Sequence, residues 1–389
     1  MRLSRRRFVS GFSSMGALSF VDSLAHSAEL NDEELFAKVD ELAAKAVDDR
    51  LSAGIAFGMI RYGKSIRSGA HGVASADAST DLSPESVFRI ASVTKVFVAI
   101  AVMKLVEDRQ LELEDTLERY FGGFLKDTEV SVYQLLSHTS GLKDWWELEL
   151  PSDLPQDFPL LDEPHDALEK CKDLFHFAPG THHWYSNTGF VLLGELIERV
   201  SGTKLESFIG DRVLKPAGLT KTSWVGDRLS NLASTQGHHR IAEPTPHFKI
   251  ADNVGSPRAA GGLLSSVDDM LRLSSHLFAG DLLARETVEK MSQMAKLLNG
   301  TPVSKSTWHP SYIESLPAPP EFMQDSGWGL GMSRFTSAGK PVIWHSGGIP
   351  GYNAIWLNFP TLSTSIAFLA NTDNGAVPAF NEVVPLIVS

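Results

Sequence analysis

The segment FRIASVTKVF, residues 88–97, contains a serine and a lysine three positions apart, Ser92 and Lys95. From Ser92 to Leu111 the sequence has no glycine or proline and is rich in Val, Ala and Ile, which predicts a buried helix. Residues three apart share a helix face, so the lysine amine can reach the serine hydroxyl and, with a pKa lowered by burial, act as its base. The alternative is a helix-capping Ser92 and a lysine whose charged end reaches solvent.

The Ser-x-x-Lys pattern occurs four times, and position distinguishes the copies. The copies that start at Ser140, Ser201 and Ser337 each carry a glycine between the serine and the lysine, which is typical of a turn. The sequence contains no G-x-S-x-G, H-E-x-x-H, P-loop or G-x-G-x-x-G motif. Only Ser92 therefore combines the pattern with a helix start.

Two later segments add polar residues to this hypothesis. Tyr185 and Asn187 follow the turn sequence FAPG and directly precede an apolar stretch that predicts a helix, so Tyr185 is expected in a loop. His345, Ser346, Gly347 and Gly348 follow a short apolar strand. Glycines in such a strand let the backbone of a substrate approach closely.

Taken together, these motifs resemble the serine β-lactamase and penicillin-binding protein superfamily. The resemblance is to the class C β-lactamase-related branch, which includes D,D-carboxypeptidases, D-aminopeptidases and esterases, and it spans roughly residues 35–380. The segments that carry it, in order, are residues 88–97 (FRIASVTKVF), 135–142 (LLSHTSGL), 177–194, 259–269 (AAGGLLSSVDD) and 344–352 (WHSGGIPGY).

The resemblance implies a catalytic role for each matching residue. Ser92 resembles the acylated nucleophile and Lys95 its activating partner. Tyr185 matches the tyrosine that passes protons to the leaving group and activates water, which requires a lowered phenol pKa. Asn187 is expected to hydrogen-bond the amide of the substrate, and the backbone N–H groups of Ser92 and Gly348 to form the oxyanion hole.

One position departs from the pattern of most β-lactamases. They have a lysine where this chain has His345, and a histidine is charged only below its pKa, near 6.5 if unperturbed. We expect His345 to bind substrate, and the change argues against an efficient β-lactamase. His138 is expected to be structural. The pairs 182–183 and 238–239 are two histidines each without a third ligand, so we expect no metal and no cofactor.

The two ends of the chain predict strands, and the middle predicts helices. We expect an α/β (α+β), β-lactamase-like fold: an antiparallel sheet built from both chain ends, flanked by helices, with an inserted helical lobe. The α/β lobe is placed at about residues 29–95 and 260–389 and the helical lobe at about 96–259. The local predictions are a helix at 32–49, a hairpin at 55–60 and 65–73, and strands at 342–344, 354–359 and 365–369.

Composition excludes several classes of partner. The chain of 389 residues has a formal net charge of −12, and its only Lys/Arg cluster lies within the first seven residues, so we expect no nucleic-acid partner. The single cysteine, Cys171, excludes an intramolecular disulfide. We expect a monomer that acts on a small ester, amide or peptide.

The N-terminal residues 1–28 resemble a twin-arginine export signal. Arg5, Arg6 and Arg7 precede a weakly apolar stretch, residues 8–21, which is too short to span a bilayer that needs about 20 residues. We expect an exported bacterial protein, periplasmic or secreted, without a stable membrane anchor. The alternative is a disordered basic tail on a cytoplasmic protein.

The sequence therefore predicts an exported serine hydrolase that forms an acyl-enzyme on an ester or amide substrate, and is esterase-like, D,D-peptidase-like or β-lactamase-like. A competing hypothesis is a non-catalytic penicillin- or peptide-binding module on the same scaffold. A metallohydrolase has no ligand motif in its favour. The substrate depends on loops such as residues 145–164, in which Trp145 and Trp146 either line a pocket or simply pack.

Overall fold

The computed structural model describes residues 30–389 except 63, 78–79, 123, 126, 150–163, 227–234, 243–245 and 253–254. The predicted export signal, residues 1–28, lies outside the described residues, as does most of the loop 145–164. Within the described part of the chain, no helix is long and apolar enough to cross a membrane.

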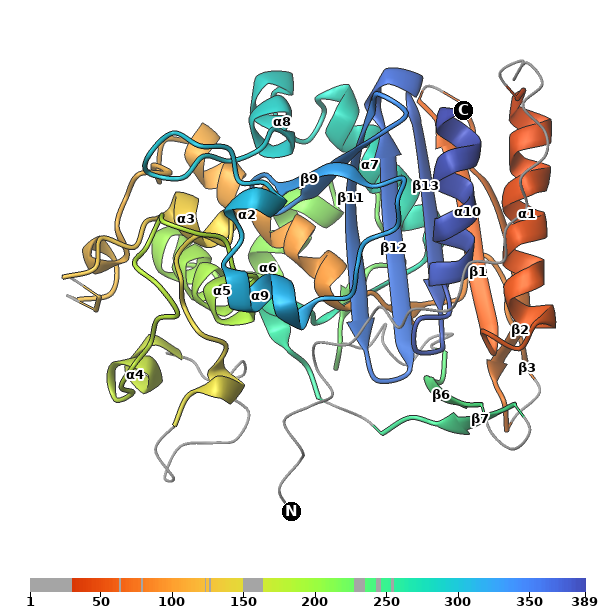
Figure 1. The fold of residues 1–389 in the computed structure, drawn as a ribbon, viewed down its shortest axis with the longest axis horizontal. Helices are drawn as coiled ribbons and strands as arrows, with labels where there is room; N and C mark the ends of the chain where they lie inside the picture. The colour runs from red at the N-terminus through yellow and green to blue at the C-terminus, as the bar shows by residue number, and fades with distance from the viewer. Residues whose placement is uncertain are drawn as a thin grey trace.

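An eight-stranded antiparallel sheet forms the centre of the fold (Figure 1). Its strand order is β3-β2-β1-β13-β12-β11-β10-β9, so strands from the two ends of the chain meet where Ile55 of β1 pairs with Ala370 of β13. This confirms the predicted fold class. The strands are β1 (Gly54–Arg61), β2 (Arg67–Ser75), β3 (Thr80–Asp81), β9 (Gln324–Trp328), β10 (Ser333–Ser337), β11 (Lys340–Ile349), β12 (Tyr352–Phe359) and β13 (Thr364–Ala370).

Helices cover both faces of the sheet, which is why its central strands are apolar on both sides. Helices α1 (Asp32–Asp48) and α10 (Val377–Val388) lie side by side on one face, with Val39 and Phe380 fully buried against it (Figure 1). Helix α7 (Val267–Ala279) packs on β1 and β13 from the other face. All seven residues of β13 are accordingly buried.

Helix α2 (Thr94–Glu107) forms the core of the helical region. It is apolar on nearly all sides and packs against α5 (Asn187–Ser201) and α6 (Leu205–Ile209), which explains its near-continuous run of Val, Ala and Ile. The remaining α-helices in the described residues are α3 (Val132–Leu136), α4 (Pro164–Glu169), α8 (Arg285–Ser292) and α9 (Pro310–Ser315).

The structure differs from the sequence prediction mainly between residues 220 and 265. The sequence predicts mostly helix up to about residue 268, with a Pro- and Gly-rich loop around residues 234–257. Instead, this stretch forms the hairpin β6–β7 and supplies two strands of a small three-stranded sheet, β4-β8-β5. These strands have two to four residues each, too short for their side chains to establish a clear alternation of polar and apolar positions. They are β4 (Phe88–Arg89), β5 (Ser223–Trp224), β6 (His238–Ile241), β7 (His247–Ile250) and β8 (Leu263–Ser265). The lobe boundaries stay a prediction.

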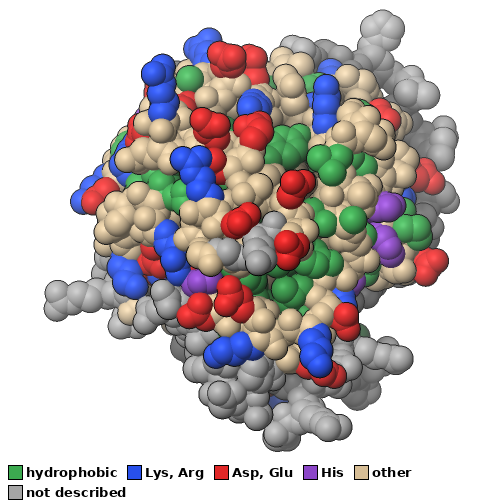
Figure 2. Space-filling view, turned by 90° about the vertical axis from the view of Figure 1, so that its left-hand side faces the viewer, with side chains coloured by type: hydrophobic (Ala, Val, Ile, Leu, Met, Phe, Trp, Pro, Cys, Tyr) green, Lys and Arg blue, Asp and Glu red, His purple; other side chains and the backbone are tan. Residues whose placement is uncertain are grey.

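The face of the molecule shown in Figure 2 carries scattered charge. Lys and Arg side chains lie among Asp and Glu side chains rather than gathered together, and hydrophobic side chains form a patch between them near the centre. Because basic residues form no continuous area on this face, it offers no surface suited to a polyphosphate.

Candidate functional site

Ser92 lies in a single 3-10 turn, η1 (Ala91–Val93), which continues directly into α2. Ala91 has a φ of 45°, an unfavourable conformation for a residue with a side chain. The turn packs tightly against β11: a Cβ added to Gly347 would lie 2.1 Å from the carbonyl oxygen of Ile90. Gly347 therefore lets the strand touch the turn that holds Ser92, and the next residue, Gly348, is exposed at this point.

The amine of Lys95 is fully buried and has three close oxygen neighbours. Lys95 Nζ lies 3.2 Å from Ser92 Oγ, 2.8 Å from Asn187 Oδ1 and 2.5 Å from the carbonyl oxygen of Ala260. Burial lowers the pKa of Lys95 to about 7, against a smaller opposing effect of the Asp144 charge. The prediction of a lysine with a lowered pKa beside Ser92 is confirmed.

Tyr185 lies over this amine, but its pKa differs from the expectation. Lys95 Nζ is 4.9 Å from the centre of the Tyr185 ring, and the ring stacks on His138 at a centroid distance of 4.3 Å. Burial raises the pKa of Tyr185 above its usual value, and an interaction with Ser92 lowers it by less. The expected lowered phenol pKa is therefore wrong, because desolvation disfavours a buried phenolate. The Tyr185 hydroxyl makes no hydrogen bond of regular geometry, so its contact with Ser92 is a loose one.

Asn187 is the first residue of α5, and a buried carboxylate fixes it there. The backbone N–H of Asn187 donates to Asp144 Oδ1 at 2.5 Å, and its Nδ2 donates to Asp144 Oδ2 at 3.1 Å. The N–H of Thr188 also donates to Asp144 Oδ1 at 3.1 Å. Asp144 thus satisfies two of the free N–H groups at the start of the helix, where a negative charge is favourable, and the Ser186 hydroxyl accepts from the N–H of Gly189.

His345 is buried behind Tyr185 in β11. The centres of the two rings are 6.5 Å apart, and His345 Nδ1 lies 2.7 Å from the carbonyl oxygen of Ser346. Burial lowers the pKa of His345 to about 3, helped by the Lys95 charge. The imidazole is therefore neutral across the physiological range, and its charge does not change near pH 6.5, as that of an unperturbed histidine would. Its Nε2 has no hydrogen-bond partner.

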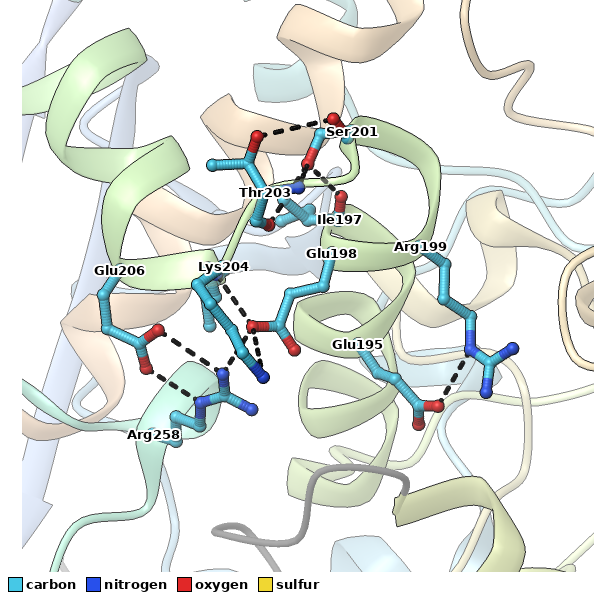
Figure 3. Close-up of polar contacts among 10 residues, drawn as sticks. Glu195, Ile197, Glu198, Arg199, Ser201, Thr203, Lys204, Glu206 and Arg258 are labelled. Atoms are coloured by element: carbon cyan, nitrogen blue, oxygen red, sulfur yellow. Dashed lines mark hydrogen bonds and ion pairs between the residues drawn. The ribbon is translucent and has the colours of Figure 1, made fainter.

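An ion-pair cluster around Arg258 (Figure 3) holds the turn that ends at Ala260, whose carbonyl oxygen accepts from Lys95. Arg258, in η7 (Arg258–Ala260), has a φ of 43° and reaches Glu198 on α5 at 2.7 Å and Glu206 on α6 at 2.9 Å. Its side chain is 14% exposed, so these pairs are better shielded from solvent than surface salt bridges. The cluster ties η7 to the same helix that carries Asn187.

The structure brings Ser92, Lys95, Tyr185 and Asn187 together, with His345 behind Tyr185. Three further residues of the site were not predicted from the sequence: Asp144, Ala260 and Tyr312. Tyr312 lies on α9 and interacts with the backbone of Tyr185, and burial raises its pKa. Asp144 follows LLSHTSGL by two positions, and only its burial distinguishes it from other acidic residues. Ala260 contributes a backbone oxygen, which no side-chain pattern reveals.

The other candidate positions have structural surroundings. His138 is buried, as expected, and its Nδ1 accepts from the N–H of Ser186. Ser201 and Ser337 lie at a helix end and at a strand end before a turn, and Ser140 lies in a buried loop. Among the described residues, no group of three or more His, Cys, Asp or Glu side chains is arranged to hold a metal ion.

Known proteins are similar in sequence to about three quarters of this chain. Penicillin-binding protein 4* of Bacillus subtilis is 25% identical over 308 residues, 75% of this chain and 62% of the relative. A D-aminopeptidase of Brucella anthropi is 26% identical over 299 residues, 77% of this chain and 52% of the relative. The chain thus spans between half and two thirds of the length of these two relatives.

Solved structures share the fold. A penicillin-binding protein homologue from Pyrococcus abyssi, described as octameric, superimposes with a TM-score of 0.73 at 24% identity, over 90% of this chain and 76% of that one. A D-amino acid amidase from Ochrobactrum anthropi gives 0.71 at 21% identity, over 91% and 99%. The family model described as Beta-lactamase matches residues 39–383. This chain therefore belongs to the Beta-lactamase family.

Proposed function

We propose that this protein is an exported serine hydrolase that forms an acyl-enzyme on Ser92 with an uncharged ester or amide. The observation that carries the proposal is the set of oxygens around Lys95 Nζ. The Asn187 amide oxygen and the Ala260 carbonyl can only accept hydrogen bonds, so they occupy both N–H groups of the neutral amine. The lone pair of the amine is left for the Ser92 hydroxyl, 3.2 Å away.

The proposed reaction begins with proton transfer from Ser92 to Lys95. As the amine takes the proton, Ser92 Oγ attacks the carbonyl carbon of the substrate, and the backbone N–H groups of Ser92 and Gly348 stabilise the resulting oxyanion. Tyr185, which remains a phenol at neutral pH, donates its proton to the leaving group and regains one from the Lys95 ammonium beneath its ring. A water molecule then hydrolyses the ester on Ser92, with Lys95 as the base.

An assay panel tests this function without knowledge of the natural substrate. The panel contains p-nitrophenyl esters, a D-amino acid amide, a D-Ala-D-Ala peptide and a chromogenic cephalosporin, each compared with Ser92→Ala. We expect Ser92-dependent turnover of esters or amides, and little turnover of the cephalosporin. The relatives described as a D-aminopeptidase and a D-amino acid amidase motivate the amide. Stoichiometric acylation without turnover of any compound would instead favour a binding module.

The neutral state of His345 predicts how substrate charge affects the rate. In the wild type, kcat/KM for a carboxylate-bearing and for a neutral substrate should depend on pH in the same way between pH 6 and 8. His345→Lys adds a cation and should raise kcat/KM for the carboxylate substrate by about 5- to 100-fold, the effect of a hydrogen bond to a charged group, with little change for the ester. Paired pH-rate profiles measure this. A wild-type loss specific to the carboxylate substrate near pH 6.5 would show that His345 is charged there.

Export is the second part of the proposal, and it rests on the paired arginines at residues 5–7. Expressed with its own N-terminus in a bacterium, the protein should reach the periplasm. Replacing Arg5, Arg6 and Arg7 by lysine should retain it in the cytoplasm, although the charge is unchanged. Fractionation followed by immunoblotting measures the distribution, and equal export of both forms would refute the twin-arginine signal.

A further inference from the structure

Asp144 is a buried acidic residue to which the reaction above assigns no role. It directly precedes the short turn η3 (Trp145–Glu147), is 7% exposed, and accepts three hydrogen bonds from the start of α5. Two of these come from backbone N–H groups and explain how α5 begins. The third, from Asn187 Nδ2, connects Asp144 to the groups that surround the lysine amine.

This third hydrogen bond determines which end of the Asn187 amide faces Lys95. An ionised carboxylate can only accept, so the NH2 group of Asn187 must point toward Asp144. The amide oxygen then points the other way, where it lies 2.8 Å from Lys95 Nζ. The four groups form one chain of contacts, from Ser92 through Lys95 and Asn187 to Asp144.

The opposite orientation of the amide would interfere with the base. With its NH2 group toward Lys95, Asn187 would donate to the lone pair of the neutral amine and compete with the Ser92 hydroxyl for it. The neutral amine would also lose one of its two acceptors. Asn187 alone has no means to prevent this rotation, because the two ends of an amide are nearly equal in size.

We propose that Asp144 is a positioning residue for the lysine base: it fixes the Asn187 amide with its oxygen toward Lys95 and supplies a negative charge that stabilises the ammonium formed when Ser92 loses its proton. The proposal rests on the proposed function, since it assigns Asp144 a task in acylation. Asp144 acts through Asn187 and through its charge, without touching the substrate.

The charge of Asp144 is coupled to the groups around it. Burial raises the pKa of Asp144 to about 7, while the hydrogen bonds from Asn187 and Thr188 lower it, so the carboxylate carries its charge above about pH 7, where neutral Lys95 acts as the base. Glu147 is the nearby carboxylate that raises it further, and the Asp144 charge in turn raises the pKa of Lys95, Tyr185 and Tyr312. Loss of this charge should therefore lower the pKa of Lys95.

The test is the second-order rate constant for labelling of Ser92 by a fluorophosphonate, measured from pH 5 to 9 on the full-length protein. Asp144→Asn removes the charge and places an NH2 group toward Asn187. We expect the maximal labelling rate to fall by about 100-fold and the pH at which the rate rises to move down by about one unit, as expected for loss of one nearby charge. With a p-nitrophenyl ester, kcat should fall while KM changes less than about threefold.

Asp269→Asn is the matched control. Asp269 is fully buried on α7 and accepts bonds from the N–H of Lys221 and the hydroxyl of Thr222, and burial raises its pKa too. Its replacement should lower thermal stability as Asp144→Asn does, but leave the labelling rate per folded molecule and its pH dependence unchanged. If Asp144→Asn shows this same behaviour, Asp144 is only a structural residue and the proposal is overturned.

A second variant keeps the test informative if Asp144→Asn does not fold. Asp144→Glu retains the charge but moves the carboxylate by one methylene group. It should slow labelling while the pH at which the rate rises stays at the wild-type value, and an unchanged rate would also overturn the proposal. Wild-type protein that no fluorophosphonate labels would refute the proposed function itself, which separates that failure from failure of the role of Asp144.

Discussion

Ser92→Ala should abolish covalent labelling by a fluorophosphonate and reduce ester or amide hydrolysis by about 10⁴-fold or more, the usual effect of removing a catalytic nucleophile. In the proposed reaction Ser92 is the hydroxyl beside the neutral Lys95 amine, 3.2 Å away, and the change removes one partly buried oxygen. Intact-mass measurement before and after labelling, followed by peptide mapping, gives the position of the modification.

The other Ser-x-x-Lys copies provide matched controls for this variant. Ser201→Ala and Ser337→Ala change a serine of the same local pattern, at a helix end and before a turn, and both should label at the wild-type rate. Persistent labelling of Ser92→Ala, or a modified peptide that contains Ser140, Ser201 or Ser337, would mean that the nucleophile has been assigned to the wrong residue.

Lys95→Met should lower the acylation rate by about 10³-fold or more, because it removes the base and keeps the apolar stem. In the wild type the rate should rise with pH through about 7, since a lysine whose pKa is about 7 becomes an effective base only when it loses its proton. The residual rate of Lys95→Met should lack this rise. If the acylation rate of Lys95→Met rises with pH in the same way, the rise comes from the titration of another group. Lys104→Met, which changes a lysine of the same helix, is the control and should behave like the wild type.

The same variant should change the dependence of stability on pH. The pKa of Lys95 is lowered on folding from 10.5 to about 7, so between these values the unfolded chain binds more protons than the native protein. Stability of the wild type therefore rises with pH across that window, and the cost of the buried lysine is greatest below pH 7. Lys95→Met should be more stable at pH 7, by about 2 kcal/mol or more, and should lack this slope. Urea unfolding at pH 7 and pH 9.5 measures both.

The sequence was sufficient to predict that Ser92 and Lys95 lie together, because their relation is local. Ser92 and Lys95 are three residues apart on one helical turn, and the fold-defining motifs lie in continuous segments. Several strands near both ends were predictable for the same reason, since residues 55–60, 342–344 and 365–369 are short, mostly apolar runs. The short strands β4, β5 and β8 were not, because pairing with distant segments determines them. The hairpin β6–β7 is local, but its four-residue strands are too short to show a clear alternation.

The pKa values of the site depend on burial, which the sequence does not display. From the sequence, Tyr185 is expected to have a lowered pKa, but desolvation raises it. His345 has an ordinary pKa only if it is exposed, and desolvation lowers it. The lowered pKa of Lys95 was predictable because the apolar run around it already signals burial. The place of Asp144 in the site depends on its contacts with Asn187, which is 43 positions away in the sequence, and no local pattern encodes such a contact.

The pairing of β1 with β13 determines when this protein can fold during synthesis. The hairpin of β1 and β2 leaves the ribosome early, but the other partner of β1, β13, begins only at residue 364, long after β2 ends at residue 75 (Ile55 pairs with Ala370). Until then β1 presents an apolar, unpaired strand edge, which is the kind of surface that invites association between nascent chains. The turn η1, which holds Ser92, also completes its packing late, because β11, against which it packs, is made late. Closing so long a loop carries an entropic cost and slows folding. Protection of the nascent chain, more than the stability of the finished molecule, should therefore limit the yield of active protein.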